Sequence, residues 1–247
     1  PSTEHKVPQL YEPGIVILLS GEKLIEIGQH SFKYDTHQAL ILTSVFPLEC
    51  TTFATPENPL VGLYIKLDLN SVRGLNEELK QYPVDTTPIQ NATDAFGIQT
   101  LPLDEALHAS IEQLLMSLND PVETALFGQE RIRHIVFLLL RHPQSFALQQ
   151  WSASDHLWNK LHQAITYMEQ NYANAVNIEM LAQISGMSVS SLHRVFKRYT
   201  SDAPMQYLKK LRLTMAKNLL QHGRQSVQQT AAAVGYESVS QFTREFK

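Results

Sequence analysis

The sequence predicts an α+β protein. An N-terminal β-barrel or jelly roll with a helical hairpin precedes an all-α domain that holds two helix-turn-helix units joined by a linker helix. Three observations support this fold class: short β-type runs fill residues 14–69, two amphipathic helices are expected over residues 103–140, and a ten-residue helical motif occurs on both sides of a long helix at residues 204–220.

The charge divides along the chain. Residues 175–247 contain 10 Lys and Arg against 4 Asp and Glu, a net of +6, whereas residues 1–174 contain 10 against 20, a net of −10. A basic module joined to an acidic one suggests that the C-terminal part meets a polyanion, although surface composition alone can produce such a difference. We expect a boundary near residue 150, giving domains 1–150 and 151–247.

The N-terminal runs are short, close together and without intervening helices, which is typical of a small antiparallel barrel or jelly roll. Two turn sequences, "SGEK" and "GQH", are expected to form hairpins. The runs are "GIVILLS", "LIEIG", "HSFKY", "ALILT", "LECTTFA" and "LVGLYIKL".

The helical pair at about 103–141 has apolar faces that must be buried, either on the barrel or against a second subunit, so both internal packing and a homodimer are open. The sequences "HPQS" and "WSAS" interrupt the pattern after it. The likeliest linker between the domains therefore runs from Pro143 to about Ser154.

An internal repeat defines the C-terminal domain. "SVSSLHRVFK", from Ser188, and "SVSQFTREFK", from Ser238, are identical at six of ten positions. Each follows a short apolar helix end that closes on a glycine, Gly186 or Gly235. A helix, a glycine-containing turn and a second capped helix form a helix-turn-helix, here expected at about 177–198 and 227–247.

A helix that enters the major groove packs one face on a core and presents polar side chains to the bases. The expected core faces are Val189, Leu192 and Phe196 in the first unit, and Val239, Phe242 and Phe246 in the second. Arginine can bind guanine, glutamine can pair with adenine, and the methyl group of threonine can meet that of thymine. Lysines near the helix ends suit phosphates. The candidate DNA-binding residues are Ser190, Ser191, His193, Arg194, Lys197, Ser240, Gln241, Thr243, Arg244 and Lys247.

The long helix between the units has two apolar seams, one for each unit, and over 17 residues it spans roughly 26 Å. It can therefore hold two recognition helices about one turn of DNA apart. Ser238 and Gln241 have the spacing of a capping box at the start of the last helix. The alternative is a plain helical bundle, but a bundle does not require acid-poor polar faces at matched positions.

Other site classes have weaker support. A metal cupin needs a closely spaced histidine pair and a nearby carboxylate, whereas His30 and His37 lie seven residues apart and Glu49 follows a different turn. We expect no metal, no cofactor and no enzymatic activity. The single cysteine, Cys50, is expected to be a buried apolar residue rather than a redox sensor. No apolar run is long enough for a membrane span, so we expect a cytoplasmic protein without membrane contact.

Residues 156–247 resemble the AraC/XylS family of bacterial transcription regulators, whose DNA-binding domain has two helix-turn-helix units and a linker helix. The stretches that carry the resemblance are "LAQISGMSVSSLHRVFKRYT", "APMQYLKKLRLTMAKNLL" and "AAAVGYESVSQFTREFK". Two departures stand out. Ser201 occupies a turn position where the family often has glycine, and the chain ends at Lys247 whereas relatives usually continue, so a C-terminal truncation is expected.

The N-terminal stretches "GEKLIEIGQHSFKYD" and "ATPENPLVGLYIKLDL" resemble the cupin-like domain of one AraC-type subgroup. The resemblance implies a sequence-specific regulator, an activator rather than a repressor. Its expected partners are double-stranded DNA, RNA polymerase, a small-molecule effector and a second copy of the chain. The alternatives are a cupin-type enzyme with a helical appendage and a regulator controlled by protein contacts instead of a ligand.

Overall fold

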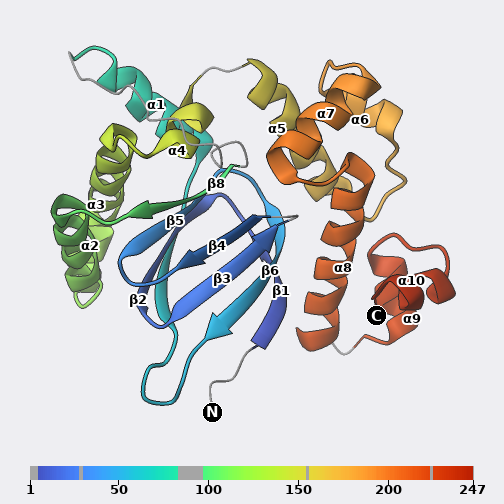
Figure 1. Ribbon diagram of the computed structural model, residues 1–247, viewed down its shortest axis with the longest axis horizontal. Helices are drawn as coiled ribbons and strands as arrows, with labels where there is room; N and C mark the ends of the chain where they lie inside the picture. Colours follow the sequence, from blue (N-terminus) through green and yellow to red (C-terminus); the bar gives the residue numbers. More distant parts are fainter. Residues whose placement is uncertain (1–4, 28–29, 83–96, 154–155, 223–224, 247) are drawn as a thin grey trace.

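The computed structural model describes residues 5–27, 30–82, 97–153, 156–222 and 225–246. Within these residues, eight strands form two four-stranded antiparallel sheets that face each other (Figure 1). The first sheet has the order β1-β6-β3-β4, with β1 His5–Tyr11, β6 Phe46–Phe53, β3 Glu22–Ile27 and β4 His30–Tyr34. The second has the order β7-β2-β5-β8, with β7 Val61–Lys66, β2 Gly14–Ser20, β5 Gln38–Leu42 and β8 Ile98–Pro102.

The second sheet is buried on both faces, and the alternation along β2 shows this directly. Val16 and Leu18 point into an apolar cluster shared with the first sheet. Ile15 and Ile17 point the other way, into a cluster shared with the helices. Because successive side chains of a strand point to opposite faces, a continuous apolar run such as "GIVILLS" is required where both faces are covered.

One of the two expected hairpins is wrong. The strands on either side of "SGEK", β2 and β3, lie in different sheets, so Gly21 carries the chain across the sandwich with a φ of +80°. The strands around "GQH", β3 and β4, do pair antiparallel. The sequence patterns also missed β1 and β8. A proline at position 8 weakens the β1 pattern, and β1 is accordingly an edge strand, where a missing N–H is tolerated.

Four helices lie beside the sandwich: α1 Leu69–Leu79, α2 Glu105–Ser117, α3 Pro121–Arg141 and α4 Phe146–Ser152. The carboxylates of Asp68, Asp104 and Asp120 accept backbone N–H groups at the starts of the first three. The expected linker at Pro143 to Ser154 instead contains α4. Leu148 and Trp151 are buried in the main apolar cluster, which makes this segment a packed helix rather than an exposed connection.

The C-terminal part is all helical, and the expected α+β fold class with two helix-turn-helix units is confirmed. The first unit consists of α6 Ile178–Ile184 and α7 Val189–Thr200, preceded by α5 His156–Asn171. The linker helix is α8 Pro204–His222. The second unit consists of α9 Val227–Ala233 and α10 Val239–Phe246.

The capping box belongs to a different helix from the one expected. Ser238 Oγ accepts a hydrogen bond from the backbone N–H of Gln241 at 3.3 Å, but the Gln241 amide bonds Glu245 instead of reaching back. Both halves of the motif are present at α9, between Ser226 and Gln229. Gln241 is thus engaged along its own helix, because Glu245 lies one turn further on.

The linker helix divides its apolar contacts along its length. Tyr207, Leu208 and Leu211, in its first half, lie in the cluster that contains the first unit. Ala216, in its second half, lies in a separate cluster with α9 and α10. The two expected seams thus largely hold, since Leu213 also lies with the second unit, but Leu219 of the first seam contacts the second unit's cluster and Met215 contacts both clusters.

The two parts of the chain share one buried cluster, which runs from the second sheet through α4 and α5 into α7 and α8. The linker helix lies alongside β1 and β6 (Figure 1). The hydroxyl of Tyr207, which is 1% exposed, donates a hydrogen bond of 2.5 Å to the carbonyl of Val45, and Arg73 on α1 donates one of 2.9 Å to Asn159 on α5. The boundary near residue 150 stays a prediction.

Among the described helices, none is long and apolar enough to cross a membrane.

Ser201 adopts the backbone conformation that explains the family's preference for glycine at this turn. It ends α7 with a φ of +62° and is the one non-glycine residue with positive φ among those described. A side chain in this left-handed region is strained by roughly 1 to 2 kcal/mol.

Candidate nucleic-acid interface and ligand pocket

The exposed face of α7 carries the first set of predicted DNA-binding residues. Its N-cap, Ser188, accepts the backbone N–H of Ser191 at 3.2 Å. Leu192, Val195, Phe196 and Tyr199 are buried and hold the helix on its core. Of the five predicted residues on this helix, Ser191 is half-buried. The other four are exposed: Ser190, His193, Arg194 and Lys197.

Three of the six predicted core residues are placed differently, one in α7 and two in α10. Val189 is 37% exposed, and Val195 fills the core in its place. In α10 the buried residue is Phe242, whereas Val239 is 38% exposed and Phe246 is 37% exposed. The Phe246 ring lies 5.1 Å from that of Phe242. The second recognition helix is therefore anchored mainly through one aromatic side chain.

The polar face of α10 is also exposed. Ser240, Thr243 and Arg244 line a shallow hollow with Val239. The hydroxyl of Thr243 donates to the carbonyl of Val239 at 2.8 Å, so this hydroxyl is engaged within its own helix. Lys247 lies outside the described residues.

The described cations of these faces, Arg194, Lys197 and Arg244, are not tied up in ion pairs within the described part of the chain. Glu245, the acidic residue of α10, is instead held by Tyr236 and Lys209 on the inner side of the helix. Both recognition helices therefore carry an exposed face with hydrogen-bond donors and cations, as a major-groove contact requires.

The structure also places the residues that a metal site or a redox site would use. No group of three His, Cys, Asp or Glu side chains in it could hold an ion. Cys50 is 2% exposed and lies in the apolar cluster between the sheets.

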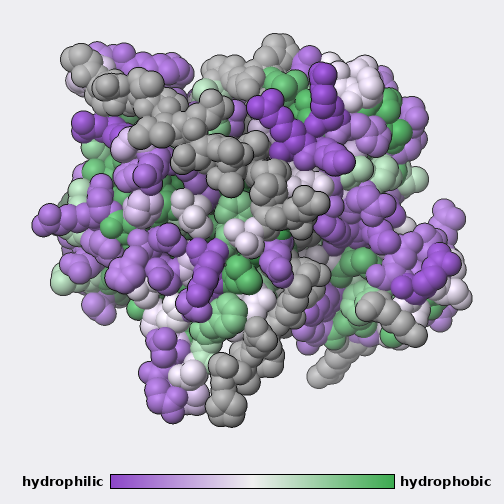
Figure 2. Space-filling view, viewed as in Figure 1, coloured by the Kyte–Doolittle hydropathy of each residue, from purple (hydrophilic) through white to green (hydrophobic). Residues whose placement is uncertain are grey.

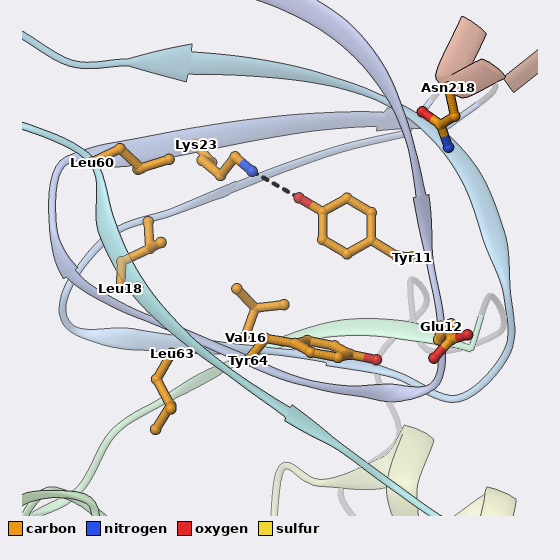
Figure 3. A pocket seen from close by; sticks show the side chains of 10 residues that line it. Tyr11, Glu12, Val16, Leu18, Lys23, Leu60, Leu63, Tyr64 and Asn218 are labelled. Carbon is orange, nitrogen blue, oxygen red and sulfur yellow. Dashed lines mark hydrogen bonds between the residues drawn. The ribbon is translucent and has the colours of Figure 1, made fainter. Parts of the chain in front are cut away.

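A pocket of about 590 Å³ is lined by residues of both sheets (Figure 3). Most of its wall is apolar, and a few polar groups converge on it, as is typical of small-molecule sites. Its lining residues are Tyr11, Glu12, Val16, Leu18, Lys23, Leu60, Gly62, Leu63, Tyr64 and Asn218.

Lys23 is the cation of this pocket. It is 7% exposed, and its ammonium donates a hydrogen bond of 2.7 Å to the hydroxyl of Tyr11; the two side chains point toward each other in Figure 3. Burial lowers the pKa of Lys23, because the ammonium loses solvating water. Burial likewise raises the pKa of the Tyr11 hydroxyl well above its ordinary value. The tyrosine is thus a neutral partner, and an anion beside Lys23 would offset the cost of burying its charge.

The pocket touches the helical part of the chain through Asn218, on the second half of α8. Sequence reasoning did not find Lys23, Tyr11 or Asn218. A local signal exists for Lys23, which alternates in phase with the buried Ile25 and Ile27 of β3 and so points inward. No local signal exists for Asn218, whose neighbours across the pocket are about 200 residues away in the sequence.

Family models match most of the chain. Residues 1–147 match the model of the AraC-type transcriptional regulator N-terminus, and residues 181–247 match the model of a helix-turn-helix domain. The HTH-type transcriptional activator RhaS of Escherichia fergusonii is 34% identical over 88 residues, which cover 36% of this chain and 32% of that protein. RhaS of Escherichia coli strain SMS-3-5 is 28% identical over 140 residues, covering 56% and 49%. The matches thus span about half or less of these curated relatives.

Solved structures share the whole fold. ToxT from Vibrio cholerae covers 100% of this chain and 93% of its own, with a TM-score of 0.61 and 12% identity. Another ToxT structure, bound to (E)-4-(8-methylnaphthalen-1-yl)but-3-enoic acid, has a TM-score of 0.61 with 11% identity, and covers 100% of this chain and 93% of its own. At this identity the likeness concerns the fold alone.

Proposed function

Because this chain belongs to the AraC family of transcriptional regulators, we propose that it is a bacterial, cytoplasmic activator that reads two neighbouring DNA elements with α7 and α10 and senses a small molecule in its barrel pocket. The family is one of DNA-binding regulators, which sets aside the cupin-type enzyme. RNA polymerase, as the machinery an activator recruits, is the second proposed partner. RhaS, an activator by name, supports the sign of regulation.

The observation that carries the proposal is the pair of exposed polar faces on one linker helix. The 19 residues of α8 span roughly 28 Å, close to the roughly 34 Å between successive major-groove faces on one side of DNA. Each recognition helix presents an exposed arginine, Arg194 or Arg244, among short polar side chains, and neither has an ion-pair partner among the described residues. An arginine that is not tied to a carboxylate is available for the two acceptors of guanine.

The proposal is tested by mixing the protein with sheared genomic DNA near physiological salt and sequencing what it retains. We expect one or a few sites, each with two elements about one turn apart. Retention of random fragments alone, with no enriched sequence, would contradict sequence-specific recognition and leave only electrostatic binding.

For the effector, we propose an apolar molecule with one anionic group, most simply a carboxylate. The apolar wall suits a hydrocarbon body, and Lys23 with the Tyr11 hydroxyl suits the anion. ToxT supports this class, since its solved complexes include an unsaturated fatty acid and a substituted butenoic acid. Because Asn218 belongs to the linker helix, such a ligand would contact both the barrel and the DNA-binding part.

Lys23→Met should remove the preference for a carboxylate while keeping the apolar wall. We expect decanoate to raise the melting temperature of the wild-type chain more than 1-decanol does, and the variant to bind decanoate roughly tenfold to a hundredfold more weakly, since a charged hydrogen bond contributes about 1.5 to 3 kcal/mol. Lys33→Met, on an exposed lysine paired with Glu22, is the control. Equal decanoate affinity in wild type and Lys23→Met would contradict the role of Lys23.

We also propose that the tips of α2 and α3 form a homodimer contact. Large apolar side chains more than half exposed gather there, and Figure 2 shows green surface among purple at the left edge, where α2 and α3 lie. These residues are Met116, Leu118, Val122, Leu126 and Phe127. Sedimentation equilibrium should give a dimer for the wild type and a monomer for Leu126→Glu. A monomeric wild type at micromolar concentration would rule this contact out.

A further inference from the structure

The two helix-turn-helix units are joined by very few side chains besides α8 itself. The first unit belongs to the large apolar cluster, whereas the second has its own small cluster of five buried residues. Tyr172 and Met215 are the partly buried side chains that touch both clusters. Apolar packing alone therefore leaves the second unit attached mainly to the second half of α8.

Arg212, in the middle of α8, bridges this gap. Its Nε donates a hydrogen bond of 2.6 Å to the carbonyl of Tyr172, and its Nη2 donates one of 2.8 Å to the carbonyl of Asn174. Both carbonyls lie just after α5, which belongs to the bundle of the first unit. The other side of the guanidinium lies 5.9 Å from the ring centroid of Tyr236, in the turn of the second unit.

Tyr236 connects Arg212 to the second recognition helix. Its hydroxyl donates a hydrogen bond of 2.9 Å to Glu245 of α10, and its ring packs edge-on against Phe242 at 5.3 Å. Glu245 also pairs with Lys209, which is on α8, at 3.6 Å. Arg212 is thus connected to α10 through one aromatic ring and one carboxylate.

At the same junction, the backbone of the second unit is in close contact with the loop after α5. A Cβ added to Gly235, which has a φ of +83°, would lie 2.6 Å from the carbonyl oxygen of Ala173. The turn of the second unit therefore rests directly on residues 172–174. This contact has no directional bonds of its own, so the angle between the units depends on the bonds that Arg212 makes to the same loop.

We propose that Arg212 is a positioning residue that fixes the distance and angle between the two recognition helices, and so selects the spacing of the DNA elements that the protein binds. Its planar fork can bond two carbonyls while one face lies on an aromatic ring, which a lysine cannot do. The inference rests on the proposed use of α7 and α10 to read DNA.

The test is a selection from random duplex DNA with the wild-type chain, Arg212→Met and Arg212→Lys, followed by sequencing. We expect one spacing between the two elements for the wild type and a spread over neighbouring spacings for both variants. Affinity for the preferred two-element duplex should fall about tenfold as the effective concentration of the second unit falls, whereas affinity for either element alone is unchanged. Lys210→Met, on the same helix as Arg212, removes a surface ion pair with Asp202, which precedes the helix, and should behave as the wild type.

Three outcomes would overturn the proposal. An unchanged spacing distribution in Arg212→Met would show that the units are held without it. Loss of binding to a duplex that carries only the second element would show that the variant unfolds the second unit. An equal loss on every duplex, random DNA included, would show a phosphate contact instead. If the wild type itself selects no paired elements, the proposed function fails and this inference fails with it.

Discussion

Alanine at Arg194 or at Arg244 should weaken binding to the retained two-element DNA by about 1 to 3 kcal/mol each, or roughly 5-fold to 150-fold. Both guanidinium groups stand on exposed recognition faces without a carboxylate partner among the described residues. Each can therefore give two hydrogen bonds to one guanine, and its loss should relax the base preference at that position. Titration of a matched and a single-mismatch duplex measures both effects.

Two controls separate base contacts from general electrostatics. Lys197→Ala should weaken binding to specific and random DNA alike and reduce the slope of log affinity against log salt by about 1. Arg133→Ala removes an arginine that pairs with Glu78 far from the recognition helices, and it should leave DNA binding unchanged. Equal losses on specific and random DNA for Arg194→Ala and Arg244→Ala would show that these residues touch phosphates only.

Glu169→Gln should make the protein more stable at pH 8 and leave its stability nearly unchanged at pH 5. Glu169 lies on α5 and interacts electrostatically with Glu12 and with Tyr207 of α8. Burial, and secondarily the carboxylate of Glu12, raises the pKa of Glu169 from its ordinary value of 4.5 to about 7. Its Oε1 is buried and has no hydrogen-bond partner among the described residues.

The sign follows from proton binding. Between about pH 4.5 and 7 the folded protein holds a proton on Glu169 that the unfolded chain has released, so stability falls as the pH rises through this range. At 1.36 kcal/mol per pKa unit, the wild type loses at most about 3 kcal/mol from this residue, a loss that is complete just above pH 7. The glutamine variant cannot titrate and should avoid that loss.

Urea denaturation of both proteins between pH 5 and pH 8.5 measures the difference in the free energy of unfolding. Glu112→Gln removes a carboxylate from the exposed face of α2 and should show a pH dependence like that of the wild type. Parallel curves for wild type and Glu169→Gln would mean that Glu169 is ionised throughout and that water reaches its carboxylate.

The helix-turn-helix units could be predicted because their evidence is local. The caps at Ser188 and Ser238, the turn glycines and the 3.6-residue apolar stripes all act within about ten residues of chain, and the repeat supplied the same pattern twice. Two residues that the apolar stripe of α10 assigned to the core are not buried in the structure. Val239 and Phe246 are in phase with Phe242, but the described part of the chain offers them no full cover.

The barrel was predictable as a class but not in its connections. Runs of β-branched and aromatic residues indicated the strands, whereas the partner of each strand depends on contacts far along the chain. The Gly21 turn illustrates this, since its sequence suits a hairpin but β2 and β3 pair with other strands. The segment expected to be a linker likewise contains α4, in which Leu148 and Trp151 are buried. The cluster that buries them includes residues of the second sheet, which lie far away in the sequence.

By itself, the sequence determined the class of the protein, the two helices that we propose read DNA and the residues on their polar faces, since each depends on residue spacing within a single element. Only the tertiary structure decided how the parts act together. It brought Lys23 to Tyr11 in a pocket that Asn218 also lines, joined Tyr207 to Val45 across 162 residues, and set Arg212 between the two units. Such contacts depend on where separate elements dock, and no local periodicity encodes that.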